Sequence, residues 1–425
     1  MRRDMRLIPL WLIPLLYAVG SLAAGIMFPR FEYQELSSYG HGMSVSSAQA
    51  FLSAIASGTM SLTAIVFSIY FLVMQFGAAA YSKRLVLLFG RDPILYNSLG
   101  MFFATFIYAL AELVYVDRNG DGKVPFFSTL FVGALLTLSI VLLALLVQRM
   151  SQLQITNVLR IVGNEGRWVI RGTYALAEGD ASDRKAIHQR ISQICASPPS
   201  QTLRYSGPPR AVGRFEIDMF VRLAQEAQAV IVIQCAVGDT VPDGALLLRV
   251  FGNGSRIADD ALMKALRLSW DRTFEQDPKY PLRLLVDTAI MALSPAVNDP
   301  TTAVQSLDQI EDLLHRLGAC RLDAGYAKDA SGNLRLVFPM PTWDDYLSLA
   351  FDEIRIYGND SLQVQRRLRA ALQDLAVSLG DKERADAAGR YLLHLDDDLA
   401  HSNLDELDRA HARQGDRQGL GVSRP

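Results

Sequence analysis

The sequence predicts a membrane protein with a four-helix transmembrane N-terminal region followed by a mixed α+β soluble domain. Long apolar stretches fill roughly the first third of the 425 residues, and none occurs in the remainder. Each stretch reaches the ~20 residues that a helix needs to cross a hydrocarbon core of about 30 Å. The predicted spans are residues 7–28, 54–76, 94–116 and 124–147.

The first apolar stretch also resembles a secretory signal peptide, because arginines precede it and the small residues 21–25 lie near its end. The stretch is longer than the apolar core of a typical signal peptide, which favours a retained span. Cleavage would leave three spans and keep the large domain on the same side of the membrane.

The distribution of Lys and Arg around the spans predicts the orientation of the chain. Basic residues concentrate on the cytoplasmic side of membrane proteins, so we expect both termini and the soluble domain in the cytoplasm. The predicted inner side has Arg2, Arg3, Arg6, Lys83, Arg84, Arg91, Arg149, Arg160 and Arg167, and the outer side has Arg30, Arg118 and Lys123. Of these, Lys83, Arg84 and Arg91 fall in a short loop where we expect contact with the headgroups of the lipid bilayer.

Composition and motifs exclude several classes of function. The net charge of −2 gives no electrostatic reason to expect nucleic acid as a partner. Cys195, Cys235 and Cys320 are far apart, so they predict neither a disulfide framework nor a zinc site. Motifs of nucleotide binding, nucleophilic catalysis and zinc hydrolysis are missing from the sequence, so we expect neither an enzyme nor a cofactor.

Small and polar residues recur along one side of the predicted second span, at intervals of three, four or seven. One interpretation is close packing against another helix, with the hydroxyl groups bonded to the helix backbone. The other is the hydrated face of a pore, because polar groups in lipid require protein or water as partners. The side chains are Ser53, Ser57, Ser61, Ser68 and Gln75, with Ala64 between them.

Glu112 is the one carboxylate inside the four predicted spans, near the outer end of the third. Its side chain could reach the membrane interface, or it could form an ion or proton site. The loop after it contains Asp117, Asn119 and Asp121 in the spacing that begins a calcium loop. Ser128 stands where the bidentate Glu should be, so we interpret the loop as a tight turn and expect no metal.

The soluble part divides, by its turn residues and periodicity, into four segments. A helical connector and polar region covers 151–212, in which the helix of the fourth span continues to about residue 161. A small β-module over 213–254 resembles the barrel-sandwich hairpin of lipoyl and biotinyl domains but lacks their modified lysine. A mainly helical part, 255–410, and a disordered tail, 411–425, complete the chain.

A helix-turn-helix corner within the helical part combines two prolines with residues that cap helices. Capping alone explains the pattern, and an exposed helix N-terminus at the corner could also bind a small polar ligand or a protein partner. The residues concerned are Asp287, Ser294, Asn298, Asp299 and Thr302.

The same segment carries a family resemblance. Leu285-Val286-Asp287-Thr288-Ala289, followed by A-L-S-P-A-V-N-D-P-T-T-A-V over 292–304, resembles domain-of-unknown-function family 2254 of predicted bacterial membrane proteins. Segments 75–92, 237–250 and 343–358 agree in order, although Lys83 replaces the family's proline. The resemblance implies a multi-pass protein of the bacterial cytoplasmic (inner) membrane and carries no activity with it.

Two functions are compatible with these observations. The first is an oligomeric channel or transport-related protein in which the second span lines the path and the cytoplasmic domain regulates or assembles the homo-oligomer. The alternative is a non-conducting membrane scaffold or sensor that recruits a cytosolic partner through the corner around Asn298 and Asp299.

Overall fold

The computed structural model describes most of the chain, which folds into two compact units, residues 1–154 and 155–425. The described residues are 9, 11–35, 43–80, 93–118, 120, 122–151, 155–174, 181–252, 256–322 and 325–421.

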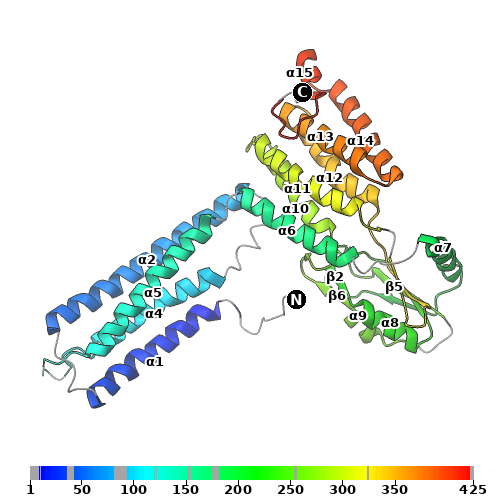
Figure 1. The fold of residues 1–425 in the computed structure, drawn as a ribbon. Helices are drawn as coiled ribbons and strands as arrows, with labels where there is room; N and C mark the ends of the chain where they lie inside the picture. Colours follow the sequence, from blue (N-terminus) through cyan, green and yellow to red (C-terminus); the bar gives the residue numbers. More distant parts are fainter. Residues whose placement is uncertain are drawn as a thin grey trace. The chain divides into compact units, whose positions relative to one another are not determined.

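The first unit consists of four long apolar helices that lie side by side (Figure 1). Each is long and apolar enough to cross a membrane, and the prediction of four long apolar helices is confirmed. The helices are α1 (Leu12–Glu35), α2 (Val45–Ala80), α4 (Pro93–Leu113) and α5 (Phe126–Ser151). Helix α2 begins nine residues before the predicted span, because Ser44 Oγ accepts a hydrogen bond from the backbone of Ser47 and caps the helix.

Helix α4 forms the centre of this unit and packs against the other three helices. Small residues permit the close contact with α1. A Cβ atom on Gly100 would lie 2.6 Å from the ring of Tyr17, and one on Gly25 would lie 2.8 Å from Ala111. Small side chains at helix contacts are the usual means by which spans pack closely in lipid. Because of this packing, α4 buries more of its surface than its three neighbours.

The strands of the second unit form two sheets. A five-stranded sheet has the order β1-β5-β3-β8-β7, with β3 and β8 parallel and the other neighbours antiparallel. Its strands are β1 (Gln201–Arg204), β5 (Leu246–Phe251), β3 (Val230–Ile233), β8 (Leu334–Val337) and β7 (Tyr326–Lys328). The second sheet contains β4 (Thr240–Val241), β2 (Arg210–Phe215) and β6 (Leu266–Ser269), paired antiparallel in that order.

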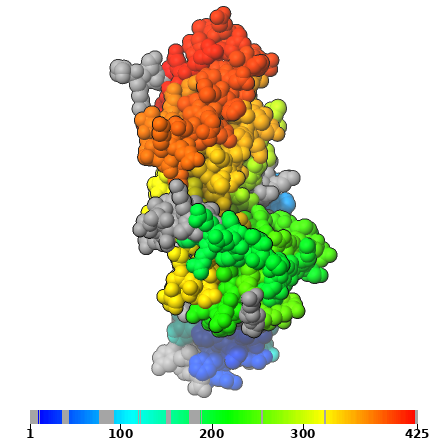
Figure 2. All heavy atoms as spheres, turned by 90° about the vertical axis from the view of Figure 1, so that its right-hand side faces the viewer, coloured from blue at the N-terminus to red at the C-terminus, as the bar shows by residue number. Residues whose placement is uncertain are grey.

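These strands extend beyond the 213–254 segment in which the sequence analysis expects a β-module. Strands β1, β6, β7 and β8 come from outside it, and Figure 2 shows the later strands as yellow atoms against the green atoms of the earlier ones. Apolar residues at successive positions of β3 and β5 form one core with residues of α8 (Ile217–Glu226) and α9 (Asp259–Ala265). The likeness to a barrel-sandwich hairpin stays a prediction.

The turn before β4 requires glycine. Gly238 has a φ of +91°, a backbone conformation that side chains disfavour. A Cβ atom at this position would also lie 2.3 Å from Asp277 Oδ2. The turn thereby brings the β-strands against the loop that precedes the helical part.

The remainder of the second unit is helical. It contains α6 (Ile155–Tyr174), α7 (Ala181–Cys195), α10 (Lys279–Ala292), α11 (Pro300–Gly318), α12 (Trp343–Tyr357), α13 (Leu362–Ser378), α14 (Lys382–Ala400) and α15 (Glu406–Ala412). Helix α6 packs against α10 and α11. The sequence analysis expects the helix of the fourth span to continue into this region, and residues 152–154, where it would do so, lie outside the described residues.

The end of the chain differs from the expected disordered tail of residues 411–425. Backbone N–H groups of Gln418 and Gly421 donate to the carboxylate of Asp416, and the backbone N–H of Asp416 donates to the carbonyl of Arg366 in α13. These bonds hold the chain against α13 as far as Gly421, because a carboxylate can satisfy several backbone donors of one turn.

Candidate functional site

The hydroxyl-bearing side of α2 is exposed on the first unit. Ser57, Ser61 and Ser68 each donate to the backbone carbonyl four residues earlier, at 2.7, 2.9 and 2.8 Å. Thr59 and Thr63 also bond to the helix backbone, but they lie on the buried side. The predicted set Ser53, Ser57, Ser61, Ser68 and Gln75 is therefore brought to one surface that the other helices of the unit leave uncovered in the described part.

Glu112 lies apart from that surface, in contact with α5. Its side chain is fully buried, and its Oε1 atom accepts a 2.6 Å hydrogen bond from Thr129 Oγ1. This placement differs from the interpretation in which the side chain reaches the membrane interface. Tyr108, one turn earlier in α4, shares a 2.9 Å hydrogen bond with Ser128 beside it.

A second buried carboxylate, Glu32 of α1, lies close to this group. Its two oxygens accept hydrogen bonds from the backbone N–H groups of Phe127 and Ser128, at 2.8 and 2.9 Å. These donors belong to the first turn of α5. The backbone N–H groups of a first turn have no acceptors within the helix, and the helix dipole there favours a negative charge. The sequence analysis did not select Glu32, because its contact with α5 spans 95 residues of sequence.

The loop after Glu112 forms a tight turn. Asp117 Oδ1 accepts from the backbone N–H of Gly122 at 2.8 Å, and the backbones of Asp117 and Lys123 also bond. Gly120 and Gly122 both have positive φ, as a turn of this kind requires. Asn119 and Asp121 of the partial calcium pattern lie outside the described residues, as do Lys83, Arg84 and Arg91 of the inner loop.

The α10–α11 corner uses its polar side chains locally. Asp299 caps α11 by accepting from the N–H and the hydroxyl of Thr302, at 3.1 and 2.6 Å. Ser294 Oγ donates to the carbonyl of Met291, and Asn298 adopts a φ of +49°. The exposed residues of the turn are Pro295, Ala296, Val297 and Asn298.

Asp287 belongs to a different contact from the rest of the corner set. It pairs with Arg283, which also donates to Glu353 of α12, so this group connects α10 to α12. The hydrogen bond to Glu353, with the pair to Asp287, raises the pKa of Arg283, and the same hydrogen bond lowers the pKa of Glu353. This arrangement indicates a structural role for Asp287.

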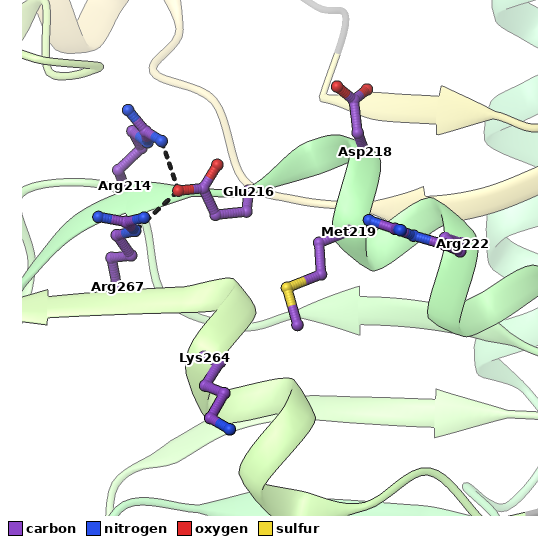
Figure 3. Close-up of a pocket in the computed structure, with 7 residues that line it drawn as sticks. All are labelled: Arg214, Glu216, Asp218, Met219, Arg222, Lys264 and Arg267. Atoms are coloured by element: carbon purple, nitrogen blue, oxygen red, sulfur yellow. Dashed lines mark hydrogen bonds and ion pairs between the residues drawn. The ribbon is translucent and has the colours of Figure 1, made fainter. Parts of the chain in front are cut away.

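A basic cleft of about 630 Å³ lies in the second unit, between α8 and the end of α9 (Figure 3). Four of its lining side chains are cationic and two are anionic. Strand β2 supplies Arg214, the β2–α8 junction supplies Glu216, α8 supplies Asp218, Met219 and Arg222, α9 supplies Lys264, and β6 supplies Arg267.

The charges of the cleft are arranged around Glu216. Arg214 and Arg267 are direct partners across β2 and β6, and both donate to Glu216 Oε1, which lies between them in Figure 3. Arg222 and Lys264 have no ion pair within the described part of the chain. Arg222 and Lys264 are therefore available to bind an anion. They lie in the same cleft as Arg214 and Arg267, whose orientation Glu216 already fixes.

Sequence reasoning missed this cleft. Its residues come from positions 214–222 and 264–267, which meet through the pairing of β2 with β6 and the packing of α8 on α9. The one signal in the sequence is a cation-rich pattern at the ends of two short strands, and such a pattern normally indicates a solvated surface.

Known proteins are similar to this chain in sequence. A family model described as predicted membrane protein (DUF2254) matches residues 9–374.

The chain belongs to the DUF2254 family.

The match includes all four spans, the corner and the basic cleft, so the resemblance seen in the sequence is confirmed. Two relatives are uncharacterized protein Mb1321c of Mycobacterium bovis and uncharacterized protein Rv1290c of Mycobacterium tuberculosis. Each is 28% identical over 368 residues, which is 84% of this chain and 69% of the relative. No solved structure matches the chain.

Proposed function

We propose that this protein is an oligomeric channel or transport-related protein of the bacterial cytoplasmic membrane. The observation that carries the proposal is the exposed serine face of α2, on a helix long enough to cross the bilayer. Copies of the chain would assemble with these faces directed toward a common path. Both termini and the second unit would then lie in the cytoplasm, as the distribution of Lys and Arg favours.

The chemistry of the α2 face supports a hydrated path. Ser57, Ser61 and Ser68 each direct the hydroxyl hydrogen to a carbonyl of their own helix, which leaves oxygen lone pairs directed outward. Lone pairs of this kind can replace part of the hydration of a cation or bond to water. The small side chains would also permit close approach of neighbouring helices in the assembly.

The second unit would regulate this path through its basic cleft. Arg222 and Lys264, together with the oriented Arg214 and Arg267, suit a small anion that carries phosphate or carboxylate groups. Glu216 and Asp218 would limit the affinity for such a ligand, as a reversible sensor requires. No catalytic step is part of the proposal.

Flux measurements on the full chain in liposomes test the proposed path. Ser57→Leu and Ser61→Leu should reduce the flux of ions or small solutes severalfold, because each places a bulky apolar group on the lining face. Thr137→Leu is the matched control, since Thr137 is also exposed and bonded to its own helix but lies on α5. Equal flux in all three variants, or silence of the wild type after confirmed insertion, would reject the channel.

The exposed turn at Val297 and Asn298 favours the alternative, a membrane scaffold or sensor that recruits a cytosolic protein. Because Asp299 and Ser294 are occupied by capping, recruitment would depend on Val297 and the backbone of the turn. Particle images in detergent distinguish the two functions. A ring with α2 around a central axis supports the channel, and a monomer or dimer without an axial path supports the scaffold.

A further inference from the structure

The carboxyl group of Glu112 is incompletely satisfied inside the four-helix unit. Its side chain is 0% exposed, and Thr129 donates to its Oε1 atom. Its Oε2 atom has no hydrogen-bond partner among the described residues. A buried carboxylate with one free oxygen is unfavourable, because water no longer solvates the charge and protein groups replace only part of that solvation.

Glu32 shows how the same unit accommodates an ionised carboxylate. Both of its oxygens accept from backbone N–H groups at the start of α5, where the helix dipole adds to the attraction. Glu112 has only the hydroxyl groups of Thr129 and Ser128 beside it, and no backbone N–H of the described residues donates to it. The negative charge of Glu32 nearby further disfavours a second negative charge on Glu112.

The other charged and titratable groups around Glu112 do not compensate it. Tyr108 of α4 bonds to Ser128, and α2 has no charged residue between positions 45 and 75. Arg30 and Arg118 lie over the ring of Tyr115, at 5.8 and 5.1 Å. Neither arginine forms an ion pair with Glu112 in the described part of the unit.

We propose that Glu112 is a proton-binding site. Its carboxyl group is neutral at neutral pH, with Oε1 accepting from Thr129 and Oε2 carrying the proton. When the pH rises and the proton leaves, a buried charge beside Glu32 weakens the packing of α4 against α5 and α1. The inference does not depend on the channel, because Glu112 lies away from the serine face of α2.

Dicyclohexylcarbodiimide tests the protonation state directly, since it adds to protonated carboxyl groups in apolar surroundings and leaves a stable acylurea. The full chain is treated in detergent at several pH values, and its peptides are examined by mass spectrometry. We expect an adduct on Glu112 that falls severalfold from about pH 6 to about pH 9. Glu32 should stay unmodified, and Glu112→Gln should abolish the adduct.

Several results would overturn the assignment. These are a lack of modification at the lowest pH, modification that does not depend on pH, and protection by sodium or lithium at constant pH. Protection by a cation would mean that the group holds a metal ion in place of the proton. Because the labelling uses the wild-type chain, it does not rely on a variant that folds.

Paired amide variants give an independent measurement. Glu112→Gln resembles the protonated acid and keeps an acceptor for Thr129, so its thermal midpoint at neutral pH should equal that of the wild type. The midpoint of the wild type should fall at high pH, and that of Glu112→Gln should fall less. Glu32→Gln removes a charge that α5 requires and should lower the midpoint at neutral pH. Equal destabilisation by both substitutions would contradict a neutral Glu112.

Discussion

Glu216 determines the electrostatics of the basic cleft. Arg214 and Arg267 are opposed across two paired strands, where like charges repel. Glu216 accepts hydrogen bonds from both, so it offsets the repulsion and fixes the two guanidinium groups. The same carboxylate opposes any incoming anion, so it links the stability of the second unit to the affinity of the cleft.

Replacement of Glu216 by Gln should therefore have two effects. The stability of the second unit should fall by about 0.5–1 kcal/mol, a small value because solvent screens these partly exposed charges. The affinity for inorganic pyrophosphate should rise, because the cleft loses a negative charge. Thermal unfolding of the full chain with and without pyrophosphate measures both effects.

The matched control for this prediction is Arg256→Gln, which breaks an exposed pair with Asp259 outside the cleft. It should change neither the midpoint nor the response to pyrophosphate. If pyrophosphate shifts the midpoint of Glu216→Gln no more than that of the wild type, the cleft is not an anion site.

At the scale of elements, helix α6 depends on glycines that face α11. A Cβ atom on Gly166 would lie 2.7 and 2.8 Å from the two terminal carbons of Leu313, and one on Gly163 would meet Gln309. Gly172, in the same helix, has nothing within 4 Å of its Cβ position. The packing of α6 on α11 therefore requires glycine at positions 163 and 166 but not at position 172.

This contrast predicts opposite effects for two similar substitutions. Gly166→Ala should destabilise the second unit by about 1–3 kcal/mol through overpacking against Leu313. Gly172→Ala should stabilise it by about 0.4–1 kcal/mol, because alanine lowers the entropy of the unfolded chain and favours helix. Thermal midpoints of the two variants test the pair, and a shift in the same direction for both would contradict the packing of α6 on α11.

The elements themselves differ in how far the sequence predicts them. The four spans follow from length and hydropathy, and the strand near Val230 follows from its β-branched residues. The sheets do not follow, because β1 and β8 join strands that are distant in the sequence. The basic cleft and the pairing of Glu112 with Thr129 were missed for the same reason, since both depend on contacts between separate elements.

The whole molecule has cysteines in contrasting surroundings. Cys195, at the end of α7, is exposed, whereas Cys235 is buried beside β3. Burial, with a smaller effect of the charge of Asp239, raises the pKa of the Cys235 thiol to about 11. At neutral pH Cys235 therefore stays a protonated and inaccessible thiol while the protein is folded.

A membrane-impermeant maleimide can report the orientation of the chain. If the second unit is cytoplasmic, Cys195 should react only after bacterial spheroplasts are permeabilised, and Cys235 should react only after unfolding. Because Cys320 is a third, partly exposed thiol, Cys195→Ser combined with Cys320→Ser should remove the signal from the folded protein. Modification of Cys195 in intact spheroplasts would place the second unit on the opposite side.

The cap that Glu32 provides for α5 has a consequence for biosynthesis. The ribosome completes α1 long before the first turn of α5, because about 95 residues separate Glu32 from Phe127. During that interval the carboxylate lacks the backbone donors that it finally binds, and the bundle lacks its last helix. We therefore expect α1 to pack first on α4, its main partner, and the end of α1 that carries Glu32 to reach its final environment only after α5 has entered the membrane.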